Sequence, residues 1–189
     1  MRTAALTGAA LAAGIWSSGG RGQEADAELF ESVNREHGPA ADRFFTTITE
    51  LGSIWASAGA AAALATVGHR RAAARGLTAA GVAWLAGQGL KKVFLRPRPY
   101  TADPGGVRMM IGPPRASSWP SSHPAVLFAF VTVAGRELRL PRSARAALAG
   151  LTAAVGASRT YVGVHYPSDV AGGLLLGRAI GTAFSRNGR

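Results

Sequence analysis

Apolar stretches without charged residues alternate with short charged segments along most of the chain. Residues 51–68 and 76–90 contain no charged side chain, and residues 170–184 are interrupted only by Arg178. A helix of about 20 apolar residues crosses the hydrocarbon core of a bilayer. These three stretches are therefore predicted to be membrane helices.

Two further apolar stretches, residues 124–135 and 146–158, are shorter, and by length they also match a buried helix of a soluble protein. We interpret them as membrane helices because the three longer stretches surround them and a bundle shields the ends of a short helix. Small residues four apart, such as Gly173 and Gly177, suit close helix packing in lipid. The expected fold is all-α, a transmembrane bundle of five to six helices.

The N-terminal part of the chain has a different composition. Residues 3–16 are apolar, which is typical of either a weak membrane helix or a signal peptide. Residues 23–50 hold seven of the ten acidic residues. Leu29, Phe30 and Val33 recur there at helical spacing, which predicts an amphipathic helix outside the bilayer core. The predicted division is an N-terminal apolar segment (1–20), an amphipathic extramembrane segment (21–50), a membrane domain (51–184) and a short basic tail (185–189).

The chain of 189 residues carries a formal net charge of +11 although 48% of its residues are hydrophobic. The absence of cysteine excludes disulfides, thiol catalysis and cysteine metal ligands. Short loops rich in Lys and Arg tend to stay cytoplasmic, which places residues 69–75 and 136–145 on that side. With five helices, residues 91–122 and 159–167 then face the external or periplasmic side. The segment 91–122 is itself basic although it is placed on the external side, so the preference of basic loops for the cytoplasm does not explain its cations.

Three clusters of chemically competent residues lie in these external segments, at the ends of predicted helices. They are Lys91 with Arg98, Ser121 with Ser122 and His123, and Arg159 with His165 and Asp169. Cations, hydroxyl groups and helix-end amides together favour phosphate among anions. If the clusters converge at the membrane surface they form a phosphate pocket, and two histidines in it indicate catalysis as well as binding.

The three clusters resemble the signature motifs of the type 2 phosphatidic acid phosphatase (PAP2) family, which read K-x6-R-P, P-S-G-H and S-R-x5-H-x3-D. The matching residues, in order, are Lys91 with Arg98 and Pro99, then Pro120 to His123, then Ser158, Arg159, His165 and Asp169. The resemblance extends over residues 51–184. It implies a membrane-bound phosphatase of lipid phosphates or diphosphates, such as phosphatidic acid, phosphatidylglycerophosphate or prenyl diphosphates including the undecaprenyl carrier lipid.

The family's mechanism assigns a role to each matching residue. His165 is the expected nucleophile, which forms a phosphohistidine, and Asp169 holds its other ring nitrogen. His123 is expected to protonate the leaving group and then to activate water. The expected phosphate ligands are Lys91, Arg98, Arg159, the Ser121 hydroxyl and backbone N–H groups around Ser122. The resemblance implies neither a metal nor another cofactor.

Two residues depart from the motif. Ser122 stands where the family has Gly, and a side chain is unfavourable if the backbone there needs a positive φ. Pro124 follows His123 directly, which favours a helix that starts at Pro124.

Other loop residues are expected to play no part in catalysis. The remaining cations, Arg96, Arg108 and Arg115, are expected to contact the surface or lipid headgroups. Tyr100 and Trp119 are expected to lie in the interfacial aromatic belt.

Three alternative functions are compatible with these patterns. Ser122 supports a catalytically weak or inactive relative that binds anions or lipid headgroups. Vanadate-dependent haloperoxidases share the phosphate pocket, but they are larger soluble proteins. A net charge of +11 permits binding of nucleic acid, yet the cations lie in short loops between apolar spans, so no nucleic-acid partner is expected. The lipid substrate and the oligomeric state are left open by the sequence.

Overall fold

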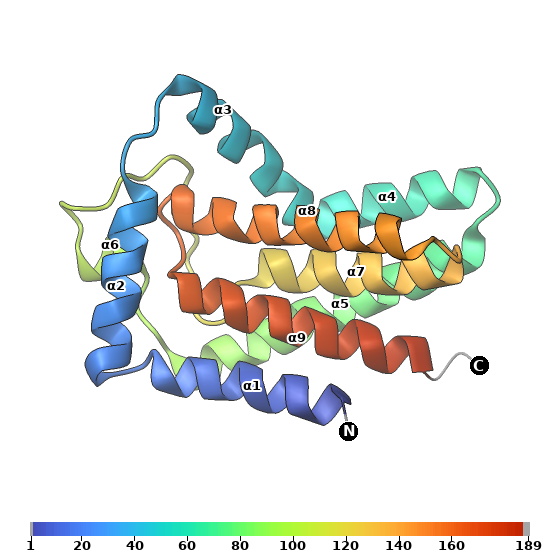
Figure 1. Ribbon diagram of the computed structural model, residues 1–189, viewed down its shortest axis with the longest axis horizontal. Helices are drawn as coiled ribbons and strands as arrows, with labels where there is room; N and C mark the ends of the chain where they lie inside the picture. Colours follow the sequence, from blue (N-terminus) through green and yellow to red (C-terminus); the bar gives the residue numbers. More distant parts are fainter. Residues whose placement is uncertain (1, 187–189) are drawn as a thin grey trace.

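The computed structural model describes residues 2–186, and this part of the chain is helical without a β-strand (Figure 1). The elements are α1 (Arg2–Trp16), α2 (Gly20–Asn34), α3 (Pro39–Ile48), the 3-10 helix η1 (Thr49–Gly52), α4 (Ile54–Thr66), α5 (Arg70–Phe94), α6 (Pro99–Ala102), α7 (Ser122–Glu137), α8 (Arg142–Tyr161) and α9 (Pro167–Arg186). The predicted all-α class is confirmed. Residues 187–189 of the predicted basic tail lie outside the described residues.

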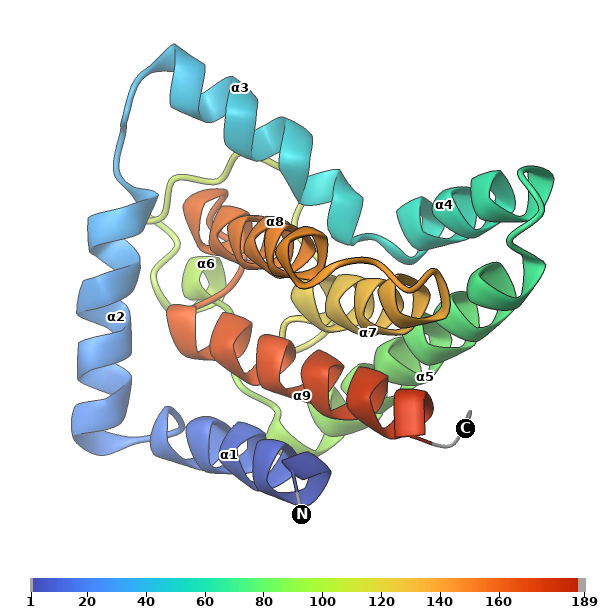
Figure 2. The ribbon, with the colours of Figure 1, turned by 45° about the vertical axis from the view of Figure 1, so that its right-hand side comes forward.

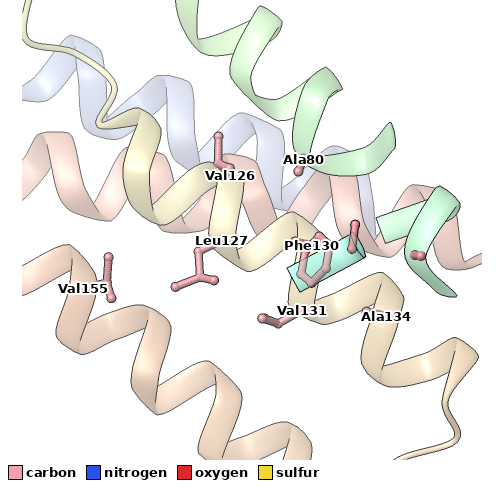
Figure 3. Packing of buried hydrophobic residues seen from close by; sticks show 9 residues of the cluster. Ala80, Val126, Leu127, Phe130, Val131, Ala134 and Val155 are labelled. Atoms are coloured by element: carbon pink, nitrogen blue, oxygen red, sulfur yellow. The ribbon is translucent and has the colours of Figure 1, made fainter. Parts of the chain in front are cut away.

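α7 occupies the centre of the bundle, with α5, α8 and α9 packed around it (Figure 2). Every residue from 124 to 135 except Phe128 is buried. Val126, Leu127 and Phe130 of α7 meet Val155 of α8 in the main hydrophobic cluster (Figure 3). A helix that is apolar on all sides is stable only when neighbours enclose it, which explains why this short stretch is the core helix.

Glycines of α9 allow its backbone to lie directly on α7. A Cβ atom on Gly173 would lie 2.2 Å from the carbonyl oxygen of Ser121, and one on Gly177 would lie 2.3 Å from that of Ala125. Further along, a Cβ on Gly181 would lie 2.7 Å from the Cβ of Thr132. This contact brings the first turn of α9 beside the first turn of α7, where two of the sequence motifs lie.

The acidic N-terminal segment forms two helices instead of the single amphipathic helix that the sequence predicts. α2 crosses one end of the bundle and contacts α8 and α9, while α1 runs along α9 (Figure 1). Within this segment α2 and α3 are separated at Gly38, which has a φ of +89°, and α3 begins at Pro39.

The apolar stretch 51–68 is also interrupted. η1 ends at Gly52, and the Ser53 side chain caps α4 by accepting a hydrogen bond of 3.0 Å from the Ala56 amide. The two arms, Pro39–Gly52 and Ile54–Thr66, are bent by 68°. Within residues 2–186, no single helix has both the length and the hydropathy of a membrane span, whereas this bent pair has them in combination.

We expect Gly177→Ala to destabilise the protein by about 1–3 kcal/mol, because the added methyl group overlaps the Ala125 carbonyl and pushes α9 away from α7. Thermal unfolding in detergent measures the change. Gly81→Ala in α5 is the matched control, because a Cβ there meets nothing within 4 Å and alanine is the better helix former. Equal Tm values for the two variants would contradict the close-packing interpretation.

Candidate active site

The three residue clusters singled out in the sequence meet at one end of the bundle. Different elements supply them: Lys91 from the last turn of α5, Arg98 from the residue before α6, Ser121 to His123 from the start of α7, Arg159 from the last turn of α8, His165 from the loop before α9 and Asp169 from its first turn. A cleft of about 280 Å³ is lined by members of all three clusters, namely Lys91, Arg98, Ser122, His123, Arg159 and His165. The structure therefore brings together residues separated by up to 78 positions, the interval from Lys91 to Asp169.

His165 is held from both sides of its ring. Its Nδ1 lies 3.4 Å from Oδ2 of Asp169, and its Nε2 lies 3.2 Å from Nη1 of Arg98. The same Asp169 oxygen accepts hydrogen bonds from the Tyr166 amide, at 2.8 Å, and from the Ser118 hydroxyl. Because Asp169 accepts at Nδ1 and Arg98 donates at Nε2, this network assigns the ring proton to Nδ1. In this tautomer the lone pair of Nε2 accepts the hydrogen bond from Arg98, so nucleophilic attack would require that bond to be exchanged for one to the substrate.

The surroundings of His165 keep its imidazole neutral. The residue lies in the loop between α8 and α9 and is 3% exposed. Burial, followed by the positive charges of Arg98 and Lys91, lowers the pKa of His165 well below its usual value of 6.5. The nucleophilic form is therefore the prevailing one at neutral pH.

Three cations are buried at the cleft. Lys91 and Arg98 are each 5% exposed, and Arg159 is 2% exposed. No Asp or Glu is among the described residues that line the cleft. Buried cations without an equal number of carboxylates favour an anion strongly, because charge interactions are weakly screened there.

Lys91 holds the loop that leads into α7. Its ammonium group donates hydrogen bonds of 2.9, 3.0 and 2.7 Å to the carbonyl oxygens of Ser117, Ser118 and Pro120. These three bonds use all of its N–H donors. In this structure Lys91 therefore shapes the cleft and contributes charge, while the direct phosphate contact expected of it would require one of these bonds to be exchanged.

Arg98 and Arg159 are anchored by hydrogen bonds to the protein and retain further N–H donors. Arg98 donates from Nε to the Ala116 carbonyl and from Nη1 to the Val164 carbonyl, both at 2.7 Å. Arg159 donates from Nη1 to the Thr49 hydroxyl at 2.7 Å, while its Nε is buried without a partner. Anchoring of this kind orients a guanidinium group before a ligand binds, which reduces the entropy lost on binding.

α7 begins at Ser122, two residues earlier than the sequence predicts. Ser122 is absent from the described non-glycine residues with positive φ, so its side chain carries no backbone penalty. Its hydroxyl fits against α5 because residue 87 there is glycine, where a Cβ would lie 3.1 Å from Ser122 Oγ. The hydroxyls of Ser121 and Ser122 are buried without partners, and the first amides of α7 have no helical acceptor. This helix end is thus rich in donors for an anion.

Arg96 does not lie at the surface, so the prediction for it is wrong. It is 6% exposed, and its Nη1 donates to Oδ1 of Asp169 and to the Ser168 hydroxyl, both at 2.7 Å. Its Nη2 donates to Oδ2 of Asp26 in α2 at 2.7 Å. Asp26 also accepts a 2.9 Å hydrogen bond from the Ser168 amide. A buried chain of charges, Asp26–Arg96–Asp169, therefore lies behind His165.

Asp26 was missed in the sequence, although a signal for it exists. It lies on the face of α2 that is buried, together with Gly22, Phe30 and Asn34. An acidic residue in line with the apolar positions of an amphipathic helix indicates a buried partner, because an unpaired buried carboxylate is very costly. The partner itself could not be named from the spacing.

Trp119 is not in an interfacial belt, contrary to the prediction. It is 1% exposed, and its ring centroid lies 4.0 Å from that of Phe94. Arg108 forms an ion pair with Asp42 of α3. Arg115 is exposed, as expected, and lines the cleft.

The donor set around the cleft suits an anion better than a metal. Within the part of the chain that the structure describes, no group of three or more His, Asp or Glu side chains is placed to hold a metal ion. That catalysis requires no cofactor stays a prediction.

An all-α bundle with a His–Asp pair facing a cationic cleft defines a class of helical phosphate-binding proteins. The sequence profile of the PAP2 superfamily matches residues 72–188, and the chain belongs to this superfamily. The resemblance identified from the three motifs is confirmed.

Two curated proteins with similar sequences agree with this assignment. The decaprenylphosphoryl-5-phosphoribose phosphatases of Mycobacterium tuberculosis strains CDC 1551 / Oshkosh and ATCC 25618 / H37Rv are each 34% identical over 92 residues, which are 49% of this chain and 48% of theirs. The chain thus matches about half the length of these curated relatives.

Two solved structures share the fold. LpxE of Aquifex aeolicus superposes with a TM-score of 0.75 at 27% identity, over 84% of this chain and 93% of LpxE. The first transmembrane PAP2 type phosphatidylglycerolphosphate phosphatase from Bacillus subtilis superposes with a TM-score of 0.78 at 20% identity, over 100% of this chain and 98% of its own.

We expect Asp26→Asn to lower kcat by roughly tenfold with little change in KM, because Arg96 then loses one of its two carboxylates and holds Asp169 less firmly. Asp42→Asn is the matched control, since Asp42 also pairs with an arginine, Arg108, but contacts neither Asp169 nor His165. Steady-state kinetics and Tm are measured for both variants. Equal losses of kcat in the two variants would show that the role of Asp26 is purely structural.

We expect His165 to remain neutral in the folded protein, in phosphate-free buffer, at pH values where a histidine of the unfolded chain is already protonated. The reason is that its pKa is lowered by burial and by Arg98 and Lys91. Histidine-selective NMR during a pH titration measures this, with His165→Ala to assign the signal and the urea-unfolded protein as reference. A midpoint near 6.5 in the folded protein would contradict the prediction.

Proposed function

We propose that the protein is an integral membrane phosphatase that hydrolyses a lipid phosphate or diphosphate through a phosphohistidine intermediate. The observation that carries this proposal is the cleft itself, in which a neutral His165, oriented from behind by Asp169, faces three buried cations, and no carboxylate is among the described lining residues. Membership of the PAP2 superfamily and the names of the phosphatases that the chain resembles support the same chemistry.

In the proposed first step, Nε2 of His165 attacks phosphorus, and the bond from phosphorus to the lipid oxygen breaks. The leaving oxygen takes the bonding electrons and receives a proton from His123, whose protonated form is stabilised by the negative charge of the bound phosphate. Asp169 stabilises the positive charge that develops on the His165 ring. Arg98, Arg159 and the amides at the start of α7 bind the non-bridging oxygens as charge builds on them.

In the proposed second step, water hydrolyses the phosphohistidine. His123, now neutral, accepts a proton from the attacking water, while the bond between phosphorus and His165 breaks and its electrons return to Nε2. Inorganic phosphate leaves, and both histidines regain their starting states. The alcohol product, or the lipid monophosphate if the substrate is a diphosphate, remains in the membrane.

The walls of the cleft support a lipid as substrate. Ile54, Trp55 and Trp84 line it beside the cations, and Trp55 is 82% exposed. Other large apolar side chains are also exposed, among them Ile15 at 69%, Leu85 at 62% and Val93 at 74%. An exposed apolar surface of this kind suits contact with acyl chains. Phosphatidic acid, phosphatidylglycerophosphate and prenyl diphosphates are the candidate substrates, and the cleft is proposed to face the external or periplasmic side.

The non-catalytic alternative loses the feature that supported it. That alternative depended on strain at Ser122, and the backbone of Ser122 has an ordinary φ at the start of α7. The serine hydroxyl adds a donor to the cleft instead of blocking it. We therefore favour an active phosphatase.

We expect the detergent-purified protein to release inorganic phosphate from at least one member of a panel of lipid phosphates and diphosphates in the presence of a metal chelator. His165→Ala should lower the rate by more than about a thousandfold, as removal of a nucleophile does. His37→Ala is the control, because His37 is exposed and is not among the residues that line the cleft. Absence of phosphate release from every substrate by folded wild-type protein would refute the proposal, and the order of rates within the panel names the lipid class.

A further inference from the structure

A second basic pocket lies at the other end of the bundle. Its volume is about 380 Å³, and it is lined by the end of α7, the start of α8 and Arg178 of α9. Four arginines line it: Arg136, Arg142, Arg145 and Arg178. Thirteen residues of α7 separate Arg136 from His123, which corresponds to about 20 Å along the helix. The pocket is therefore distinct from the catalytic cleft.

The charged side chains that line this pocket carry positive charge. None of the described residues that line it is an Asp or Glu. The adjacent acid in the chain, Glu137, is engaged elsewhere, because it forms ion pairs of 2.9 and 2.8 Å with Arg71 and Arg75. Guanidinium groups gathered in one concave site are suited to bidentate binding of a phosphate group.

Two further features indicate a built site. The Thr132 side chain lines the pocket, is 7% exposed, and has a hydroxyl that is buried without a hydrogen-bond partner. The hydroxyl lies beneath the pocket surface and adds a polar group below the arginines, not a direct contact to a ligand. The guanidinium of Arg178 lies 5.3 Å from the ring centroid of Phe128, which restricts its orientation.

Topology alone does not explain this arrangement. A general preference of basic loops for the cytoplasm requires only that arginines lie in the loop. Arg139 satisfies that preference, since it lies in the same turn and is exposed, but it does not line the pocket. The four lining arginines, by contrast, come from three helices and meet at one place.

We propose that this pocket binds the phosphate group of an anionic phospholipid, with Arg142, Arg145 and Arg178 as ligands. The pocket also has apolar walls, formed by Val131, Ala146 and Ala149, which suit the glycerol and upper acyl carbons of a lipid. A basic pocket between membrane helices is a recognised setting for anionic headgroups. The site lies beyond the proposed function, because the bound lipid is a resident partner and not a substrate.

The test compares Arg142→Ala/Arg178→Ala with Arg139→Ala, the matched control from the same turn. The probe is phosphatidylglycerol, a phosphodiester that a phosphomonoesterase does not hydrolyse, supplied as a minor component of phosphatidylcholine nanodiscs. Native mass spectrometry counts the phosphatidylglycerol that remains bound, and a titration gives its Kd. We expect the double variant to bind roughly tenfold more weakly, or worse, for each guanidinium lost, and Arg139→Ala to bind like wild type.

Several outcomes decide the proposal. Equal binding by wild type and the double variant overturns it, and an equal loss in Arg139→Ala overturns it too, since that result indicates a diffuse surface potential. Arg142→Lys/Arg178→Lys, which retains the charge without the bidentate geometry, should bind with intermediate affinity.

A parallel titration with inorganic phosphate distinguishes the two sources of the ligand. If phosphate alone binds with the same dependence on Arg142 and Arg178, the occupant is a free anion and the lipid assignment is overturned. Rates of phosphate release and Tm establish that the variants are folded, and they separate a failure of this proposal from a failure of the catalytic one.

Discussion

The carboxylate of Asp169 is the interaction on which the rest of the active end depends. It is fully buried and makes contacts with Arg96, Ser118, His165 and the Tyr166 amide, while its backbone carbonyl accepts from the Ser121 amide. One residue thereby joins the segments of all three motifs. A buried carboxyl group is stable only when such donors surround it, so the contacts that stabilise Asp169 also set the position of His165.

Positive charge is concentrated at both ends of the bundle, but the two arrangements differ. At the catalytic end the cations are buried and anchored by backbone carbonyls, which leaves them oriented and weakly screened. At the other end Arg142, Arg145 and Arg178 are exposed and surround an open pocket. The first arrangement favours stabilisation of charge in a transition state, and the second favours reversible binding of a headgroup.

Most helices predicted from local sequence patterns agree with the structure. The apolar stretches 76–90, 146–158 and 170–184 lie within α5, α8 and α9, and the all-α class follows from them. The three motifs also contribute Lys91, Arg98, Ser122, His123, Arg159 and His165 to the cleft, because each motif lies within a few residues of one helix end, whereas Ser121 and Asp169 are not among the lining residues. The predictions that failed concerned breaks and long-range partners. Helices end at or just before Gly38 and Gly52, inside segments that the sequence predicts to be continuous. The spacing of apolar residues does not reveal such breaks.

By itself the sequence determined the all-α class, the motifs of the family and the excess of positive charge, since these depend on composition and on residues within one or two turns of each other. Only the tertiary structure decided that Arg96 is buried between Asp26 and Asp169, a pairing that spans 70 residues on one side and 73 on the other. It also decided that four arginines of three helices share one pocket. The physical reason is that the partner of a buried charge depends on how helices pack, and helical spacing along the chain carries no information about which helix lies opposite.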